Sequence, residues 1–160
     1  KKTAAKAGKD LSAAFNKALT AKIASAITPQ FKNFVKALVD KGVKIVIATR
    51  ADIEDEAVKT AFAPLLGERV VLYHEESACY GAVKGDSWLR ACAKCGLSRI
   101  STIAVAGSGH SVKSALVAGM GSMAVVNDRV AYQDFGGADD VVKELSGPTA
   151  KRLLEILRVD

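Results

Sequence analysis

Apolar and polar positions along this chain follow two different periods. Dense runs of apolar, largely β-branched residues occur at 43–50, 69–75, 101–107 and 122–128. Runs of this kind are typical of strands that are buried on both faces of a parallel sheet. A weaker run at 129–134 predicts a further short strand.

Between these runs, apolar residues recur every three or four positions, which indicates helices with one buried face. This period predicts helices at residues 10–27, 28–42, 52–67, 86–96, 111–118, 138–146 and 148–159. The second of them has clear end signals, with Thr28 as N-cap, Pro29 in the first turn and Gly42 as the stop. Acidic residues at 52–56 and 136–140 are expected at helix N-termini, where the helix dipole stabilises negative charge.

Strands and helices therefore alternate along most of the chain. This order predicts an α/β fold, a Rossmann-like three-layer sandwich with a mainly parallel sheet. We expect a basic N-terminal arm at residues 1–10 and a single domain at 11–160. No apolar run reaches the roughly 18 residues that a membrane-spanning helix requires.

Charge is spread unevenly over the 160 residues. The net charge is +6, but residues 1–50 carry +9 and residues 51–160 carry −3. A lysine-rich arm on a neutral-to-acidic body suits contact with a polyanion such as RNA, and a solvated, frayed terminus is the alternative. The candidate contacts are Lys1, Lys2, Lys6 and Lys9.

Three cysteines occur, at Cys79, Cys92 and Cys95. The odd number and the lack of a regular framework indicate a reducing compartment, either the cytoplasm or the mitochondrial matrix. Cys92 and Cys95 have the spacing of a zinc half-site or a redox pair, but no second half-site follows and they fall at the end of a predicted helix. We interpret them as structural thiols, and a small redox or zinc protein stays open as an alternative.

Polar loops follow the carboxyl ends of three predicted strands, which is where open α/β sheets place their chemistry. They read ATRAD after the strand at 43–50, VKGDS at 83–87 and AGSGHS at 106–111. The last loop has two glycines of a dinucleotide-binding turn but lacks the third, so a nicotinamide site is a weak alternative.

The order and spacing of these motifs resemble the haloacid dehalogenase-like (HAD) superfamily over residues 28–133. The resemblance places Thr49 in the position of a phosphate-binding hydroxyl and Lys84 in the position of a phosphate-binding lysine. It implies a HAD-like core, and we expect no large cap domain. It also implies a nucleophilic aspartate on a first strand and acidic residues in the last loop that hold Mg²⁺.

This sequence departs from that pattern in two ways. Gly107 and Ser111 stand where the resemblance implies acidic metal ligands, and no strand followed by Asp-x-Asp precedes the other motifs. We therefore predict no catalytic residue and no metal ligand, and a vestigial anion site formed by Thr49, Lys84 and Ser108. No cofactor is expected, except Mg²⁺ if the chain is a hydrolase.

The missing first strand is expected, from the resemblance, between the strands that end near Thr49 and Ala106. It could lie upstream of Lys1, be replaced by the N-terminal arm or be donated by a partner. We predict a catalytically inactive HAD-like protein that acts as a structural or binding subunit of a larger assembly. A ribonucleoprotein such as an organelle ribosome is an assembly of this kind. The alternative is a Mg²⁺-dependent HAD-type phosphatase whose nucleophile strand lies upstream.

Overall fold

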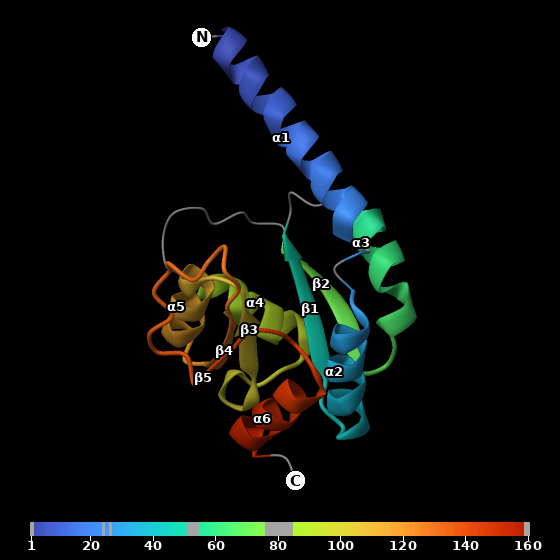
Figure 1. Ribbon diagram of the computed structural model, residues 1–160, viewed down its shortest axis with the longest axis vertical. Coiled ribbons are helices and arrows are strands. Elements are labelled where there is room, and N and C mark those ends of the chain that lie inside the picture. The colour runs from blue at the N-terminus through green and yellow to red at the C-terminus, as the bar shows by residue number, and fades with distance from the viewer. Residues whose placement is uncertain (1, 24, 26, 51–54, 76–84, 159–160) are drawn as a thin grey trace.

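Parallel strands and flanking helices make up the body of the molecule (Figure 1). The computed structural model describes residues 2–23, 25, 27–50, 55–75 and 85–158. Its strands are β1 (Ile45–Arg50), β2 (Val70–Glu75), β3 (Ile103–Ala106), β4 (Gly121–Val125) and β5 (Asp140–Val142). Strand β1 pairs with β2, and β4 lies between β3 and β5, with every pair parallel. The predicted α/β fold with a parallel sheet is confirmed.

Helices follow the predicted order along the chain. They are α1 (Lys2–Ile23), α2 (Pro29–Asp40), α3 (Asp55–Phe62), α4 (Asp86–Cys95), α5 (Gly109–Val117) and α6 (Gly147–Leu157), with 3₁₀ turns at Ala63–Leu65 and Arg99–Ser101. The Thr28 hydroxyl accepts the Phe31 N–H at 3.2 Å and caps α2 as expected. Helix α4 ends where Gly96 takes φ +63°, a left-handed conformation that favours glycine.

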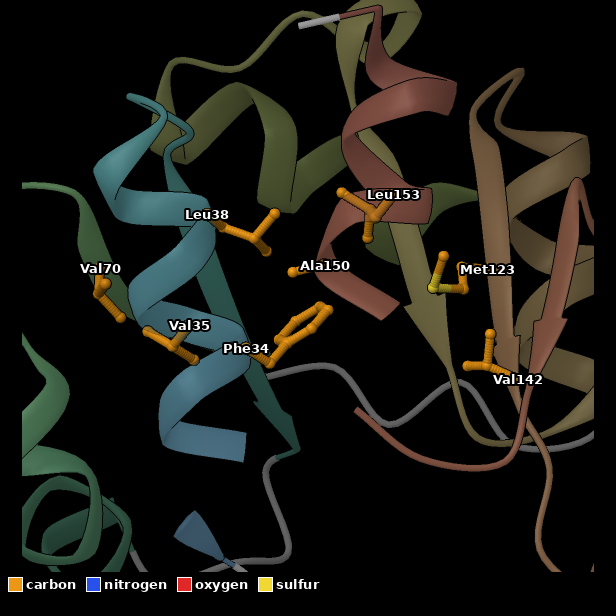
Figure 2. Close-up of a cluster of buried hydrophobic side chains, with 8 residues drawn as sticks. All are labelled: Phe34, Val35, Leu38, Val70, Met123, Val142, Ala150 and Leu153. Carbon is orange, nitrogen blue, oxygen red and sulfur yellow. The ribbon is translucent and has the colours of Figure 1, made fainter. Parts of the chain in front are cut away.

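Two helical layers sandwich the strands. Helices α2 and α6 contact each other and share an apolar cluster with β4 and β5 (Figure 2). The clustered buried residues are Phe34, Val35, Leu38, Val70, Met123, Val142, Ala150 and Leu153. On the opposite face, Cys92 of α4 packs with Ala104 of β3 and with Ala115 of α5. Successive side chains along a strand thus pack against the two different helical layers, as a three-layer sandwich requires.

Two local predictions near the C-terminus are wrong. Residues 129–134 form turns instead of a strand, and residues 140–142 of the predicted helix 138–146 form β5. Val142 is buried against the cluster shared with α2 and α6, while the Asp139 carboxylate accepts the Ser122 N–H at 2.7 Å. Two adjacent β-branched residues beside an open strand edge are more stable as a strand than as a helical turn.

The basic arm forms the first turns of α1 and is continuous with the residues that follow it. Figure 1 shows α1 extending away from the body, with its C-terminal end beside α3. Leu11 and Phe15 of α1 are 73% and 60% exposed. None of the helices in the described part of the chain is both long and apolar enough to cross a membrane.

The strands fall into two groups that are not hydrogen-bonded to each other. Strands β1 and β2 form one group and β3, β4 and β5 the other, so that β1 and β3 each leave one edge unpaired among the described strands. The resemblance to the HAD superfamily implied a missing strand between these two edges.

Candidate functional site

The candidate site lies where β1, β2 and β3 end, because parallel strands bring their carboxyl ends to one edge. Thr49 is the penultimate residue of β1 and is only 9% exposed. Its hydroxyl donates to the Tyr73 carbonyl at 3.4 Å, and its Oγ1 lies 3.2 Å from Nδ1 of His74. The hydroxyl predicted to bind an anion therefore already joins β1 to β2, and its role toward an anion stays a prediction.

The turn from Gly107 to Ser111 connects β3 to α5. The Ser108 hydroxyl oxygen accepts the Ser111 N–H at 3.2 Å and caps the helix, and the Ser108 hydroxyl donates to the Ser111 hydroxyl at 2.9 Å. Gly107 is exposed and has open space where a side chain would begin. The two serines thus occupy each other's hydrogen-bonding groups, and Ser108 also binds a free amide at the start of the helix, as Ser at an N-cap commonly does.

The loop that holds Gln133 and Asp134 covers the start of α5, although no sequence pattern predicts it near the site. The Gln133 side-chain oxygen accepts the Gly109 N–H at 2.9 Å, so one free amide of the helix end is occupied. Asp134 pairs with Lys113 at 2.8 Å, and this ammonium holds the pKa of the Asp134 carboxyl below its ordinary value. No spacing signal links residues that are about two dozen positions apart, so only the structure brings them together.

The remaining predicted site residues do not join this cluster in the described part of the chain. Lys1 and Lys84 lie outside the described residues. Lys2, Lys6 and Lys9 belong to α1, which extends away from the body, and the side chains of Lys6 and Lys9 are exposed. The anion site of Thr49, Lys84 and Ser108 therefore stays a prediction.

The residues at the turn do not suit a magnesium ion. Mg²⁺ prefers carboxylate, phosphate and water oxygens in octahedral geometry. The turn offers a glycine, Gly107, and two serines, Ser108 and Ser111. The two serine hydroxyls are already hydrogen-bonded to each other, and Ser108 also accepts the Ser111 N–H. The described residues also contain no group of three or more His, Cys, Asp and Glu side chains that could hold a metal.

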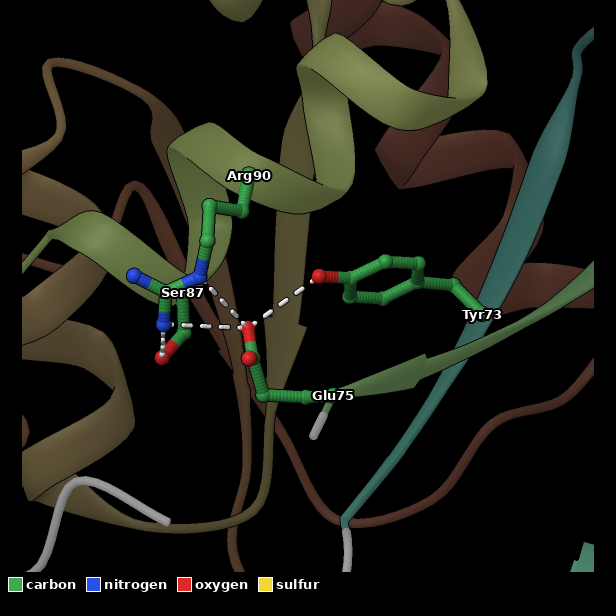
Figure 3. Close-up of polar contacts among 4 residues, drawn as sticks. All are labelled: Tyr73, Glu75, Ser87 and Arg90. Atoms are coloured by element: carbon green, nitrogen blue, oxygen red, sulfur yellow. Dashed lines mark hydrogen bonds and ion pairs between the residues drawn. The ribbon is translucent and has the colours of Figure 1, made fainter. Parts of the chain in front are cut away.

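A second polar cluster ties β2 to α4 (Figure 3). The Glu75 carboxylate, 12% exposed, accepts from the Tyr73 hydroxyl and from the Arg90 guanidinium, both at 3.2 Å. Arg90 also donates to the Ser87 hydroxyl at 3.3 Å. Burial raises the pKa of the Tyr73 phenol, and the neighbouring Glu75 carboxylate raises it further. Since these charges satisfy one another, we interpret the cluster as a clamp between strand and helix.

The two cysteines in the described residues carry free thiols. Cys92 is buried, with its Sγ 4.0 Å from Sδ of Met120, and Cys95 is partly buried. Burial raises the pKa of the Cys92 thiol, and the nearby Cys95 adds to this effect. A reactive thiol needs a lowered pKa, so this environment supports the structural interpretation of Cys92.

Comparisons with known proteins give a fold but no family. No protein-family model and no curated protein sequence matches the chain. The structure is similar to CbbY from Rhodobacter sphaeroides in complex with phosphate, with a TM-score of 0.67 and 17% identity over 86% of this chain. A mutant of the same protein in complex with xylulose-(1,5)bisphosphate gives a TM-score of 0.62 and 17% identity over 83% of this chain.

In both comparisons the match covers 64% of the CbbY chain, so this chain spans less than two thirds of its neighbours' length. These neighbours have a HAD-like fold. At this level of identity the likeness concerns the course of the backbone. This chain therefore has a HAD-like, Rossmann-type α/β fold.

Proposed function

We propose that this chain is a HAD-like domain that serves as a binding or structural subunit of a larger assembly and does not carry out metal-dependent phosphoryl transfer. Helix α1 is the part of the molecule that supports this proposal most strongly. It extends from the body over 22 residues and leaves large apolar side chains in solvent. Exposed apolar residues on a projecting helix mark a surface that a partner covers.

The two faces of α1 differ in chemistry. At 100° per residue, Leu11 and Phe15 lie on one face. Lys6, Lys9 and Lys17 lie on roughly the opposite face, and their side chains are exposed. A helix of this kind can contact protein through its apolar face and RNA phosphates through its basic face, as a subunit of a ribonucleoprotein does.

The turn at the strand ends supports the second half of the proposal. Phosphoryl transfer between two anions requires a cation to shield them. The turn from Gly107 to Ser111 holds no carboxylate, and its serine hydroxyls cap α5. These residues maintain the fold without supplying a metal site.

Substitutions on the two faces of α1 are expected to release the protein from its assembly. One double variant, Leu11→Gln with Phe15→Gln, removes the apolar face, and another, Lys6→Glu with Lys9→Glu, reverses the basic face. Both keep good helix formers on exposed positions, so the fold is preserved. The measurement is sedimentation of the tagged endogenous protein on a density gradient, with mass spectrometry of the co-migrating components.

The wild-type protein is expected to travel with a large, nuclease-sensitive particle. If the lysines bind RNA, their reversal also makes the slope of log affinity against log salt shallower by about 1 for each phosphate that is no longer bound. Ala13→Gln with Ala14→Gln is the control, since it changes exposed positions of α1 without removing charge or bulk. Migration of the wild-type protein as a free monomer would contradict the proposal.

A second candidate function is hydrolysis of a phosphate ester. The fold it shares with CbbY, which has been described with phosphate and with xylulose-(1,5)bisphosphate, favours this alternative. Under our proposal, the chain shows no Mg²⁺-dependent release of phosphate from a broad panel of phosphoesters. Turnover that requires Mg²⁺ and disappears in Lys84→Ala would establish the hydrolase instead.

A further inference from the structure

Sulfur-bearing side chains from two distant segments meet between α4 and the end of α5. Cys92 and Cys95 lie in the last turn of α4, and Met120 lies between α5 and β4. The Cys92 Sγ is 4.0 Å from the Met120 Sδ, and both side chains are buried. Sulfur atoms at this distance raise the question of a shared ligand.

Cys92 and Cys95 are neighbours on one face of α4. Side chains three positions apart on a helix have Cβ atoms about 5–6 Å apart, and two cysteines at this spacing commonly bind one metal ion. The helix end that carries them is well defined, because the Leu97 N–H donates to the Cys92 carbonyl at 2.8 Å and Gly96 takes a left-handed conformation. The two cysteines are therefore held on a fixed backbone.

The end of α5 brings Met120 to the cysteines. The Met120 N–H donates to the Ala115 carbonyl at 3.0 Å, and Gly119 before it takes φ +70°. This turn places Met120 in the same apolar cluster as Cys92 and Ala104. No sequence spacing links Met120 with Cys92, since 28 positions separate them.

The distance between the two buried sulfurs suits a shared metal ion. With metal–sulfur bonds of about 2.3 Å, two sulfurs lie about 4.0 Å apart in a trigonal site and about 3.8 Å apart in a tetrahedral site. The Cys92 and Met120 sulfurs are already separated by the trigonal distance. Cys95, on the same face of α4 as Cys92, offers a third sulfur.

Two thiols and a thioether select a soft ion. Thiolate and thioether sulfur favours Cu(I), whereas Mg²⁺ and Ca²⁺ require oxygen ligands. Zn²⁺ usually takes four ligands, and within the described residues no His, Asp or Glu forms a group of three with the two cysteines. Trp88 and Leu97 pack against the cluster and limit the access of water, which a hard cation would retain.

We propose that Cys92, Cys95 and Met120 form a binding site for one Cu(I) ion. Binding forms three copper–sulfur bonds and releases the two thiol protons to solvent, and copper keeps its oxidation state. Because the metal replaces the proton, burial that keeps a free thiol protonated does not prevent ligation. The occupied site carries one net negative charge, and the Lys44 ammonium, which donates to the Cys95 carbonyl at 2.7 Å, lies at the same helix end.

Competition for Cu(I) on the full 160-residue chain tests the proposal. Cu(I) is supplied without oxygen as its bicinchoninate complex, whose loss of colour reports transfer to the protein. The wild-type chain is expected to take one equivalent, with quenching of Trp88, the single tryptophan of the chain, which packs against the cluster. Zn²⁺ is expected to bind at least about 100-fold more weakly than Cu(I).

Matched variants separate the sulfur of Met120 from its packing. Met120→Leu keeps most of the volume and removes the sulfur, so about tenfold weaker binding is expected while circular dichroism shows a folded chain. Met123→Leu, at the other methionine of the chain, is the control and is expected to bind as the wild type does. Cys95→Ser is expected to weaken binding by about 100-fold, and Cys79→Ser is expected to leave it unchanged.

Each other outcome contradicts the proposal. Failure of the wild-type chain to take Cu(I) from the competitor would exclude the site. Equal affinity of Met120→Leu and the wild type would reduce it to a cysteine pair at a helix end. Loss of binding in Cys79→Ser, or Zn²⁺ binding as tight as that of Cu(I), would assign a different ligand set. These measurements use neither α1 nor the turn at the strand ends, so their result is independent of the proposed function.

Discussion

Alanine in place of Gly109 is expected to lower the free energy of unfolding by about 3 kcal/mol, because overpacking a closed site costs 1–3 kcal/mol and sometimes more. A Cβ at this position would overlap the carbonyl oxygen and carbon of Asp134. Those atoms belong to the backbone, so the clash cannot be relieved by rotating a side chain. The loop would have to move away from α5, and the bond from Gly109 N–H to Gln133 would break.

Gly107→Ala is the matched control, two positions earlier in the same turn. A Cβ there meets nothing within 4 Å, and Gly107 is not among the glycines with positive φ. Its stability is expected to stay within about 0.5 kcal/mol of wild type. Urea denaturation followed by circular dichroism gives both values. Equal stability of the two variants would mean that the loop of Gln133 and Asp134 does not pack tightly against the start of α5.

The elements that the sequence predicted well are those whose signals are local. Thr28 and Pro29 start α2 and Gly96 ends α4, because capping and left-handed conformations depend on single residues. The strands β1 to β4 were predictable because β-branched runs bounded by polar residues have few other stable states. The alternation of strands and helices predicted the α/β fold, and the loop motifs carried the resemblance to the HAD superfamily. The structural neighbours confirm a HAD-like fold.

Other features depend on contacts between distant residues and carry no local signal. Asp139 and Asp140 look like the first turn of a helix, but the Ser122 amide and Arg152 bind their carboxylates beside β5. Gln133 reaches the Gly109 amide from a loop that the sequence predicts as a strand. Tertiary contacts override local preference in each case.

The candidate site was predicted only in part for the same reason. The sequence shows that Gly107 and Ser111 are not acids, but not that Ser108 and Ser111 bond to each other. It places Thr49 at a strand end, but the bond from its hydroxyl to Tyr73 depends on the register of β1 and β2. Lys84 lies outside the described residues, so its part in an anion site remains a prediction.

The division of the sheet makes the apolar cluster around Met123 important for holding the molecule together. No described strand joins β1 to β3 by hydrogen bonds. The cluster instead brings Phe34 and Leu38 of α2 together with Met123 of β4 and Leu153 of α6. Helix α2 directly precedes β1, so this packing is a main connection between the two strand groups.

Met123→Ala is therefore expected to destabilise the protein by about 3 kcal/mol, within the 2–5 kcal/mol that large-to-small changes cost in cores. The Met123 side chain is fully buried, so its truncation leaves a cavity where the two groups meet. Met123→Leu keeps most of the volume and is expected to lose less than about 1.5 kcal/mol. Ile100→Ala, at a position 84% exposed, is expected to change stability by less than about 0.5 kcal/mol.

Urea denaturation monitored by fluorescence of Trp88 and by circular dichroism measures these changes and also their cooperativity. Because the cluster connects the strand groups, its disruption in Met123→Ala is expected to separate the two signals, with non-coincident transitions where the wild type shows one. A destabilisation below about 1 kcal/mol with coincident transitions would place the connection elsewhere, in α4, which contacts β2 and packs with Ala104 of β3.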